Sequence, residues 1–200
     1  MNTLFPAEPG YPEGFEYVPQ FLTEREEKNL VDEVVKINLT SFIFQGFEAK
    51  RRVASFGYDY SFDRRSLSKG KDIPRVFCPL IEKVASHLSA SPDVFAELLV
   101  TEYPVGSVIN WHRDAPPFDI IAGISLNADC VFRLRPHEKT KQGRGSIISM
   151  PVKRRSLYIM HGSARSNWQH SIAPVKDIRY SITLRTLKTE LRSTSQNEIN

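Results

Sequence analysis

The sequence has little cysteine and no long hydrophobic run. Its 200 residues include only Cys78 and Cys130, and the apolar stretches around them predict buried, reduced thiols rather than a disulfide. Residues 1–15 carry acids, prolines and glycines where a secretory signal needs a basic start and an apolar core, and no later stretch reaches the length of a membrane span. These absences argue against a disulfide scaffold and a membrane protein and predict a soluble protein of the reducing cytoplasm.

Positive charges exceed negative charges only slightly. The net charge of +4 permits an anionic partner without identifying nucleic acid. Residues 133–155 nevertheless contain eight basic side chains against one acid, Glu138: Arg133, Arg135, Lys139, Lys141, Arg144, Lys153, Arg154 and Arg155. A solvated basic hairpin and an anion-binding surface both fit this run.

Helical periodicity is confined to the N-terminal half. Thr23 and Glu26 form a capping-box pattern for a helix that runs to about Ile37, and a second helix is expected from Pro79 to Leu88. From Val94 onward the pattern changes to eight short strands separated by turns, with no helix between them. The sequence therefore predicts one domain over residues 1–200, by default a monomer. Its fold class is mainly β with flanking N-terminal helices, and residues 94–188 form a jelly-roll core.

One strand end carries two metal-ligand side chains. If residues 108–112 form a strand, His112 and Asp114 project to the same side and can share one ion. A second histidine would complete the two-histidine, one-carboxylate face of non-haem iron oxygenases, which leaves positions open for a substrate and O2. His170 within NWQHSIA and His161 before a turn are the candidates, and the strand position is preferred because strands hold ligands more rigidly.

A second signal lies in the last strand, RYSITLRTL. Arg179, Ser181, Thr183 and Arg185 alternate there and so share one strand face. A buried guanidinium needs a partner, and a dicarboxylate supplies one through a planar bidentate fork. Six residues of strand span roughly 20 Å, so we expect the arginines to divide the work: one on each end of such a ligand, or one on a metal-ligand carboxylate. An outward basic face is the alternative.

Three stretches, TEYPVGSVINWHRD, SLYIMHGSARSNWQH and RYSITLR, give the chain a likeness to a known family. Over about Leu98–Leu187 it resembles the AlkB family of iron(II)/2-oxoglutarate dioxygenases. The resemblance implies a double-stranded β-helix of jelly-roll type, Fe(II) as the metal, 2-oxoglutarate as cosubstrate and O2. It also implies oxidative demethylation of N-alkylated bases in DNA or RNA, as repair or modification, with release of succinate, CO2 and formaldehyde.

The same resemblance implies roles for residues. The iron ligands are His112, Asp114 and His170. Arg179 is matched to the distal carboxylate of 2-oxoglutarate, with Tyr103 and Ser181 as helpers, and Arg185 to its keto-acid end. The chain departs from the repair enzymes at Thr101 and Ser181, where asparagine is common, and at Pro116, where an acidic residue often reads the damaged base. Substrate choice is thus left open.

Residues 38–66 are a candidate substrate-recognition lid for methylated single-stranded DNA or RNA. The segment offers stacking and phosphate-binding side chains, among which we single out Arg51, Arg52, Phe56, Tyr58 and Tyr60. Ordinary core packing also explains so many aromatics. Two other functions remain open. One is oxidation of a protein side chain or small molecule, which Pro116 favours, and the other is a binding module with a degenerate metal site.

Overall fold

The alternating segments of the sequence pair into two antiparallel sheets. The computed structural model describes residues 10–44, 47–62 and 64–189, with the side chains of residues 43, 44 and 47 also left out. The strands are β1 Phe15–Val18, β2 Thr40–Phe44, β3 Phe47–Ser61, β4 Ser66–Lys69, β5 Phe95–Tyr103, β6 Ile109–His112, β7 Phe118–Leu126, β8 Cys130–Pro136, β9 Ile148–Val152, β10 Leu157–Met160, β11 Trp168–Ile172 and β12 Arg179–Leu187. The α-helices are α1 Glu24–Val34, α2 Cys78–His87 and α3 Gly162–Ser166.

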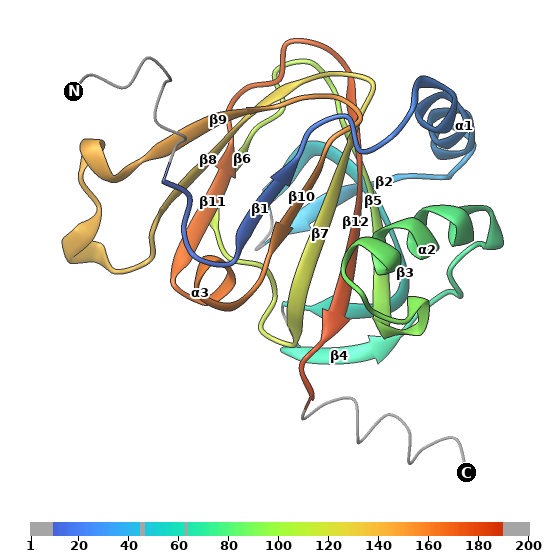
Figure 1. Cartoon of the computed structure of the whole chain (residues 1–200), viewed down its shortest axis with the longest axis horizontal. Helices are drawn as coiled ribbons and strands as arrows, with labels where there is room; N and C mark the ends of the chain where they lie inside the picture. Colours follow the sequence, from blue (N-terminus) through green and yellow to red (C-terminus); the bar gives the residue numbers. More distant parts are fainter. Residues whose placement is uncertain (1–9, 45–46, 63, 190–200) are drawn as a thin grey trace.

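The two sheets face one another. The larger has the order β1-β10-β7-β12-β5-β3-β2, with β4 paired to β3, and the smaller has the order β6-β11-β8-β9. Figure 1 shows the smaller sheet on one side of the larger sheet and helices α1 and α2 on the other. This is the predicted mainly β, jelly-roll architecture with helices on its flank.

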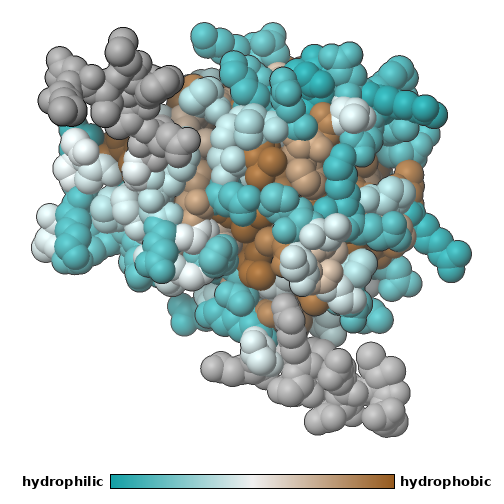
Figure 2. Space-filling model, viewed as in Figure 1, coloured by the Kyte–Doolittle hydropathy of each residue, from teal (hydrophilic) through white to brown (hydrophobic). Residues whose placement is uncertain are grey.

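Two hydrophobic layers hold these elements together. The first contains Leu30 of α1, Val84 of α2 and Ile182 of β12, so it joins the helices to the outer face of the larger sheet. The second contains Phe132 of β8 and Tyr158 of β10, which lie between the sheets. In Figure 2 hydrophobic side chains gather in the middle of the view and hydrophilic ones surround them. The inner face of each sheet is thus the one that can present a buried site.

Helix α1 begins as the sequence predicts. The Thr23 hydroxyl accepts the Glu26 N–H at 3.2 Å while the Glu26 carboxylate accepts the Thr23 N–H at 2.7 Å, which completes the capping box. The expected second helix is also present as α2. Among the described residues, no helix is long and apolar enough to cross a membrane.

Two expectations are wrong. The β region does contain a helix, α3, a single turn after His161 that falls below the length at which helical periodicity is visible in a sequence. Cys78 is exposed, although Cys130 is buried as expected, and both thiols are free. Cys78 opens α2 on its solvent side, whereas the buried face of that helix is made by residues further along, including Leu80 and Val84.

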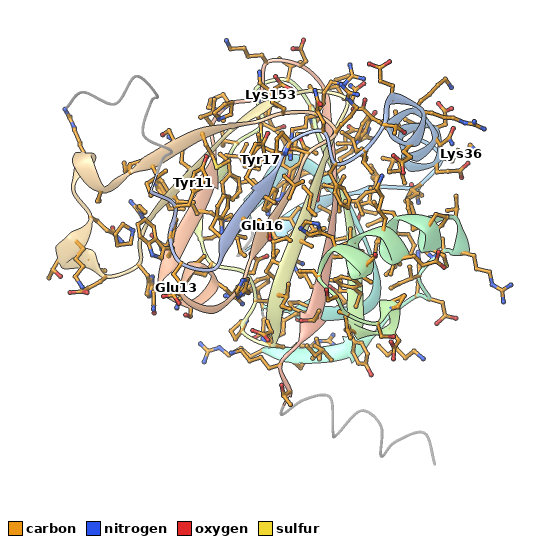
Figure 3. All side chains as sticks on the ribbon, in the orientation of Figure 1. Tyr11, Glu13, Glu16, Tyr17, Lys36 and Lys153 are labelled. Atoms are coloured by element: carbon orange, nitrogen blue, oxygen red, sulfur yellow. The ribbon has the colours of Figure 1, made fainter. Side chains whose placement is uncertain are left out.

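Strand β1 fastens the N-terminal arm to both sheets. It pairs with β10 in the larger sheet, and the Tyr17 hydroxyl accepts the N–H of Lys153, just after β9, at 3.0 Å. Figure 3 labels both residues, on β1 and at the upper edge of the molecule. The arm therefore bridges the two sheets along one edge.

Candidate active site

Two histidines meet across neighbouring strands of the smaller sheet. His112 ends β6 and lies directly opposite His170 of β11 in the strand register, and their ring centroids are 4.2 Å apart. The His112 Nδ1–H donates to the Asn110 carbonyl at 2.8 Å, which leaves Nε2 as the free acceptor. The Phe132 ring stacks on His170, with centroids 5.4 Å apart. Both imidazoles are therefore held in fixed orientations.

Asp114 reaches the same place from the loop after β6. Its Oδ2 is 3.6 Å from His170 Nε2 and is buried without a hydrogen-bond partner among the described residues. Its Oδ1 accepts a hydrogen bond from Arg185 Nη2 at 2.6 Å. Arg165 of α3 fixes the loop because one Nη2 donates to the carbonyls of Asp114, Ala115 and Phe118. One carboxylate oxygen is thus anchored while the other is free.

The surroundings keep all three groups in their metal-binding protonation states. Burial, and next the neighbouring His112, lower the pKa of His170 to about 3, and burial also lowers the pKa of His112. Burial alone would raise the pKa of Asp114, but Arg185, His170, His112 and Arg165 together outweigh it, Arg185 most strongly, and hold that pKa below its ordinary value. At neutral pH the site offers two neutral imidazoles and a carboxylate, which are the forms that bind metal.

This donor set fits Fe(II). Two imidazoles and one carboxylate with an unpartnered buried oxygen are the first half of an octahedral site. In the part of the chain that the structure describes, no three His, Cys, Asp or Glu side chains are already gathered at coordinating distances around one point. Small movements of these neighbouring side chains onto an ion are therefore part of the proposal made below. His161, the alternative third ligand, precedes α3, and its backbone N–H and C=O bind Gly14 and Arg165.

Arg179 lies deeper in the same space. It is 1% exposed at the start of β12, its Nε donates to Ser125 Oγ at 3.0 Å, and its guanidinium carbon lies 4.8 Å from the centroid of the Tyr103 ring. Its Nη1 is buried without a partner among the described residues. A buried cation with an unused donor requires an anion, so this position suits a carboxylate of a ligand.

Hydroxyl groups line the sheet beside Arg179. Ser181 of β12 lies opposite Thr101 of β5 on one side and Ser125 of β7 on the other, and all three side chains are buried. The predicted helper Ser181 is in this row, but Ser125, which the sequence argument passed over, holds the guanidinium. Its buried polar position within the otherwise apolar strand IIAGISL was the available signal.

Arg185 faces two carboxylates at once. Its Nη2 binds Asp114 and its Nη1 binds Glu97 Oε2, each at 2.6 Å, and the second oxygen of Glu97 accepts the Ser55 hydroxyl at 2.9 Å. The two arginines of β12 therefore have different partners, and Arg185 binds Asp114, the predicted metal ligand. Glu97, only 2% exposed, was not predicted. Burial raises the pKa of its carboxyl even though Arg185 acts in the opposite direction.

Tyr158 of β10 closes this space from the larger sheet. A Cβ on Gly123 of β7 would lie 2.1 Å from the Tyr158 ring, so only glycine lets the phenol lie across the strand. Burial, followed by the neighbouring Tyr103, raises the pKa of the Tyr158 phenol. Tyr158 therefore stays a neutral hydroxyl next to Tyr103 and Arg179.

The predicted substrate residues separate into two groups. Gly57, with a φ of 83°, breaks the alternation of β3, so Phe56 packs against the helix-side core whereas Tyr58 and Tyr60 pack against the core between the sheets. Arg51 is close enough to affect the pKa of His112. Arg52 points elsewhere and binds Glu102 at 2.6 Å.

The described part of the expected lid, residues 38–66, contains β2 at the edge of the larger sheet and β3 beside it. β2 pairs with β3, and β3 pairs with β5. Positions 45, 46 and 63 lie outside the described residues. Movement of this segment stays a prediction.

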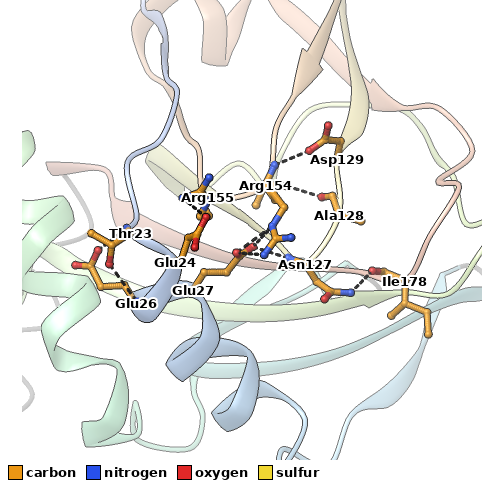
Figure 4. A network of polar contacts seen from close by, with 11 residues as sticks. Thr23, Glu24, Glu26, Glu27, Asn127, Ala128, Asp129, Arg154, Arg155 and Ile178 are labelled. Carbon is orange, nitrogen blue, oxygen red and sulfur yellow. Dashed lines mark hydrogen bonds and ion pairs between the residues drawn. The ribbon is translucent and has the colours of Figure 1, made fainter.

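The basic run 133–155 also divides. Lys153 binds Asp129 at 2.8 Å, Arg154 binds the buried Glu27 of α1 through Nε at 3.0 Å, and Arg155 lies 3.7 Å from Glu24. Figure 4 shows this network between α1 and the turns that flank β8 and β10. The last three cations of the basic run therefore form ion pairs within the fold.

Comparison with known proteins identifies the family of the chain. The model of the 2OG-Fe(II) oxygenase superfamily matches residues 14–194, so the chain belongs to that superfamily. The structure resembles that of OsALKBH1, with a TM-score of 0.69 at 14% identity over 88% of this chain and 98% of the other. It also resembles a prolyl hydroxylase from Trichoplax adhaerens, with a TM-score of 0.65 at 16% identity over 91% and 87% of the two chains.

Within the superfamily the relatives are AlkB homologues. The chain is 29% identical to the mouse tRNA (carboxymethyluridine(34)-5-O)-methyltransferase ALKBH8 over 82% of its own length and 25% of the relative. It is 27% identical to the Arabidopsis thaliana alkylated DNA repair protein ALKBH8 homolog over 80% of its length and 50% of the relative. The chain thus spans from a quarter to half of these relatives. Membership of the 2OG-Fe(II) oxygenase superfamily implies a dioxygenase that requires Fe(II), 2-oxoglutarate and O2, and the similarity to these ALKBH8 proteins agrees with the AlkB likeness of the sequence.

Proposed function

We propose that this enzyme removes N-alkyl groups from nucleic-acid bases by oxidation, with His112, Asp114 and His170 as iron ligands and Arg179 as the anchor for 2-oxoglutarate. The observation that carries the cosubstrate assignment is the unpartnered, buried Nη1 of Arg179. It lies in the layer between the sheets, where His170 and Tyr158 also lie, and no acidic side chain of the described residues pairs with it. A dicarboxylate that reaches from there toward the iron would satisfy it.

The residues around the iron and cosubstrate have separate tasks. When bound, Fe(II) and 2-oxoglutarate supply the oxidation of a C–H bond by O2, with succinate and CO2 as products, and an oxidised N-methyl group leaves as formaldehyde. Arg179, with the Tyr103 ring against it, orients the cosubstrate, and Tyr158 and Phe132 exclude water. Arg185 anchors one oxygen of Asp114 so that the other is free for the iron.

Three observations support nucleic acid as substrate. The relatives' names refer to tRNA and to alkylated DNA. Arg51 lies near the candidate metal ligands and can contact phosphate. Tyr58 and Tyr60 are half-buried at the edge of the same layer, where a base taken out of its stack could lie against them.

The test of the cofactor assignment uses succinate as its readout. Anaerobically purified protein given Fe(II), 2-oxoglutarate and then O2 should form succinate, and Asp114→Ala should abolish it because the only carboxylate ligand is lost. Arg179→Gln should raise the KM for 2-oxoglutarate about 100-fold or more, as expected for loss of a buried charged hydrogen bond, with Fe(II) affinity unchanged. Equal turnover in Asp114→Ala, or loss of iron in Arg179→Gln, would overturn the assigned roles.

The substrate test compares methylated single-stranded RNA, methylated single-stranded DNA and methylated peptides of matched length. Formaldehyde release and the matching mass loss are expected from a nucleic acid. Pro116 occupies a place two residues after the aspartate where an acidic side chain would read a base, and this favours oxidation of a protein side chain or small molecule as the second candidate. Formaldehyde or hydroxylation with peptides alone would select that candidate.

A further inference from the structure

Trp111 and two arginines lie on the outer face of the smaller sheet. Along β8, Phe132 and Leu134 point into the core between the sheets, so Arg133 and Arg135 point the other way. Trp111 lies on the outer side of β6 because its neighbour His112 points inward. The guanidinium carbons lie 5.2 Å and 4.5 Å from the centroid of the Trp111 ring. The arginines therefore rest on an aromatic surface on the reverse side of the candidate metal site.

Within the described residues, each of the two guanidinium groups is hydrogen-bonded through its Nε alone. Arg133 donates its Nε to Ser171 Oγ at 3.0 Å, and Arg135 donates its Nε to Gln169 Oε1 at 2.8 Å. Stacking on Trp111 and one hydrogen bond restrict the side chains while the outer Nη groups keep their donors free of these bonds. Two residues apart on one strand, the arginines are about 7 Å from each other.

The loop between β8 and β9 extends this positive surface. Gln142 donates to the carbonyls of Pro136 and His137 at 3.1 and 3.0 Å and approaches Gln169 at 3.5 Å, so the loop folds back beside Arg135. We call the resulting surface the basic band, and it consists of Arg133, Arg135, Lys139, Lys141 and Arg144. Within the described part of the chain, only Lys141 of this band has a carboxylate partner, Glu138 at 2.6 Å.

The rest of the basic run differs from the basic band in its ion pairs. Lys153, Arg154 and Arg155 all have acidic partners from other elements, so their charges are used within the fold. The basic band keeps four cations that have no acidic partner among the described residues, two of them immobilised. Fixed guanidinium groups without acidic partners repel one another and so destabilise the folded state. A bound anion would remove this repulsion.

We propose that the basic band is a second nucleic-acid contact, separate from the candidate active site, which binds the phosphodiester backbone of a single strand. Charge complementarity selects this occupant, because successive phosphates present a row of anions and planar guanidinium groups bind phosphate in a bidentate manner. The band deepens the proposed function, on which it rests, because it would hold the remainder of a strand whose target base lies in the active site. It recognises backbone rather than sequence.

The experiment measures binding without catalysis. Metal-free protein is titrated into a labelled, unmodified oligonucleotide of about 12 nucleotides, as RNA and as DNA, over salt from about 50 to about 300 mM. For Arg133→Gln/Arg135→Gln we expect affinity at 0.1 M salt to fall roughly 10- to 30-fold and the slope of log K against log salt to become shallower by about 1.4. Lys139→Gln/Lys141→Gln/Arg144→Gln, confined to the loop, should reduce the slope by about 2.

Lys28→Gln/Lys36→Gln, on α1 and just after it, is the matched control, since both lysines are exposed and the loss of two charges is the same. It should bind as the wild type does. Wild-type affinity in both band variants, an equal loss in the control, or equally tight binding of a polyglutamate peptide would overturn the proposal. Succinate formation without nucleic acid should stay unchanged in Arg133→Gln/Arg135→Gln. Failure of the proposed function would instead appear as absent succinate in the wild type, so the two outcomes are distinct.

Discussion

At the scale of single residues, Glu97 is the least expected member of the site. It holds one nitrogen of Arg185 while Asp114 holds another, so one guanidinium lies between the carboxylate of the proposed metal ligand and a second buried acid. The role fits a positioning residue. Without Glu97, Arg185 could rotate about its bond to Asp114 and draw the free oxygen of Asp114 away from the ion.

We therefore predict that Glu97→Gln lowers Fe(II) affinity or kcat about 10-fold, the lower end of what loss of an outer-sphere partner costs. The KM for 2-oxoglutarate should change little, because Arg179 is untouched. Iron titration and succinate kinetics measure the two effects separately. Glu102→Gln is the matched control, because Glu102 lies on the same strand and binds Arg52 on the other face. A raised KM with normal iron affinity would argue against the positioning role.

The strand parity of Glu97 indicates that its side chain faces the site, although the sequence argument did not use it. In ELLVTEY, Glu97 has the same strand parity as Thr101 and Tyr103, so a face expected to carry a cosubstrate helper also carries an acid. His170 could be preferred over His161 as the partner of His112 because its place within the strand NWQHSIA lets the backbone hold a ligand rigidly. The partner of Arg185 could not be predicted, since it depends on which strands become neighbours, and Glu97 of β5 and Arg185 of β12 are 88 residues apart in the sequence.

At the scale of elements, Glu27 joins α1 to the turns of the sheets. It is 2% exposed, accepts two nitrogens of Arg154, and accepts the Asn127 N–H at 2.9 Å. These contacts cross about 100 residues of sequence, which explains why the basic run 133–155 could be read equally well as a solvated hairpin. The acids that neutralise its last three cations lie in the first helix or in the turn before β8.

Replacement Glu27→Gln should lower the free energy of unfolding by about 1–2 kcal/mol, below the cost of breaking a fully buried pair because Arg154 is half exposed and can be rehydrated. Urea unfolding followed by circular dichroism measures this. Its neighbour Glu24 provides the comparison. The Glu24 side chain is 85% exposed and its contact with Arg155 is long, at 3.7 Å, so Glu24→Gln should have almost no effect. Similar losses in both variants would mean that general charge, not the buried contact, stabilises the junction.

Element prediction succeeded where a pattern is long and failed where it is short. Helix α1 has a capping box and a full apolar face, and the strands from β5 onward are runs of β-branched and aromatic residues bounded by turns. Helix α3 has five residues, too few for a period, and its place depends on the Ala164 N–H donating to Glu13 on the N-terminal arm. The break in β3 follows from Gly57, where a Cβ would lie 2.2 Å from the Ala96 carbonyl oxygen, a contact that no local pattern reveals.

At the scale of the whole molecule, the site lies in the layer between the sheets and takes groups from both of them. His112 and His170 come from the smaller sheet, whereas Tyr158, Arg179 and Arg185 come from the larger one. An ion and a dicarboxylate that bind groups of both sheets would tie the sheets together. Binding should therefore stabilise the folded state as a whole.

We expect this stabilisation to be stepwise. Mn(II), a redox-stable substitute for Fe(II), should by itself raise the Tm of the protein. 2-Oxoglutarate should raise the Tm further, but only when Mn(II) is present. At 100-fold excess over Kd each ligand contributes about 2.7 kcal/mol, which corresponds to roughly 5–10 °C for a domain of this size. In Asp114→Ala both shifts should vanish, whereas Arg179→Gln should keep the metal shift and lose the second one. If 2-oxoglutarate raised the Tm of Arg179→Gln as much as that of the wild type, the cosubstrate would bind elsewhere, because this variant lacks the buried guanidinium donor that is proposed to bind its carboxylate.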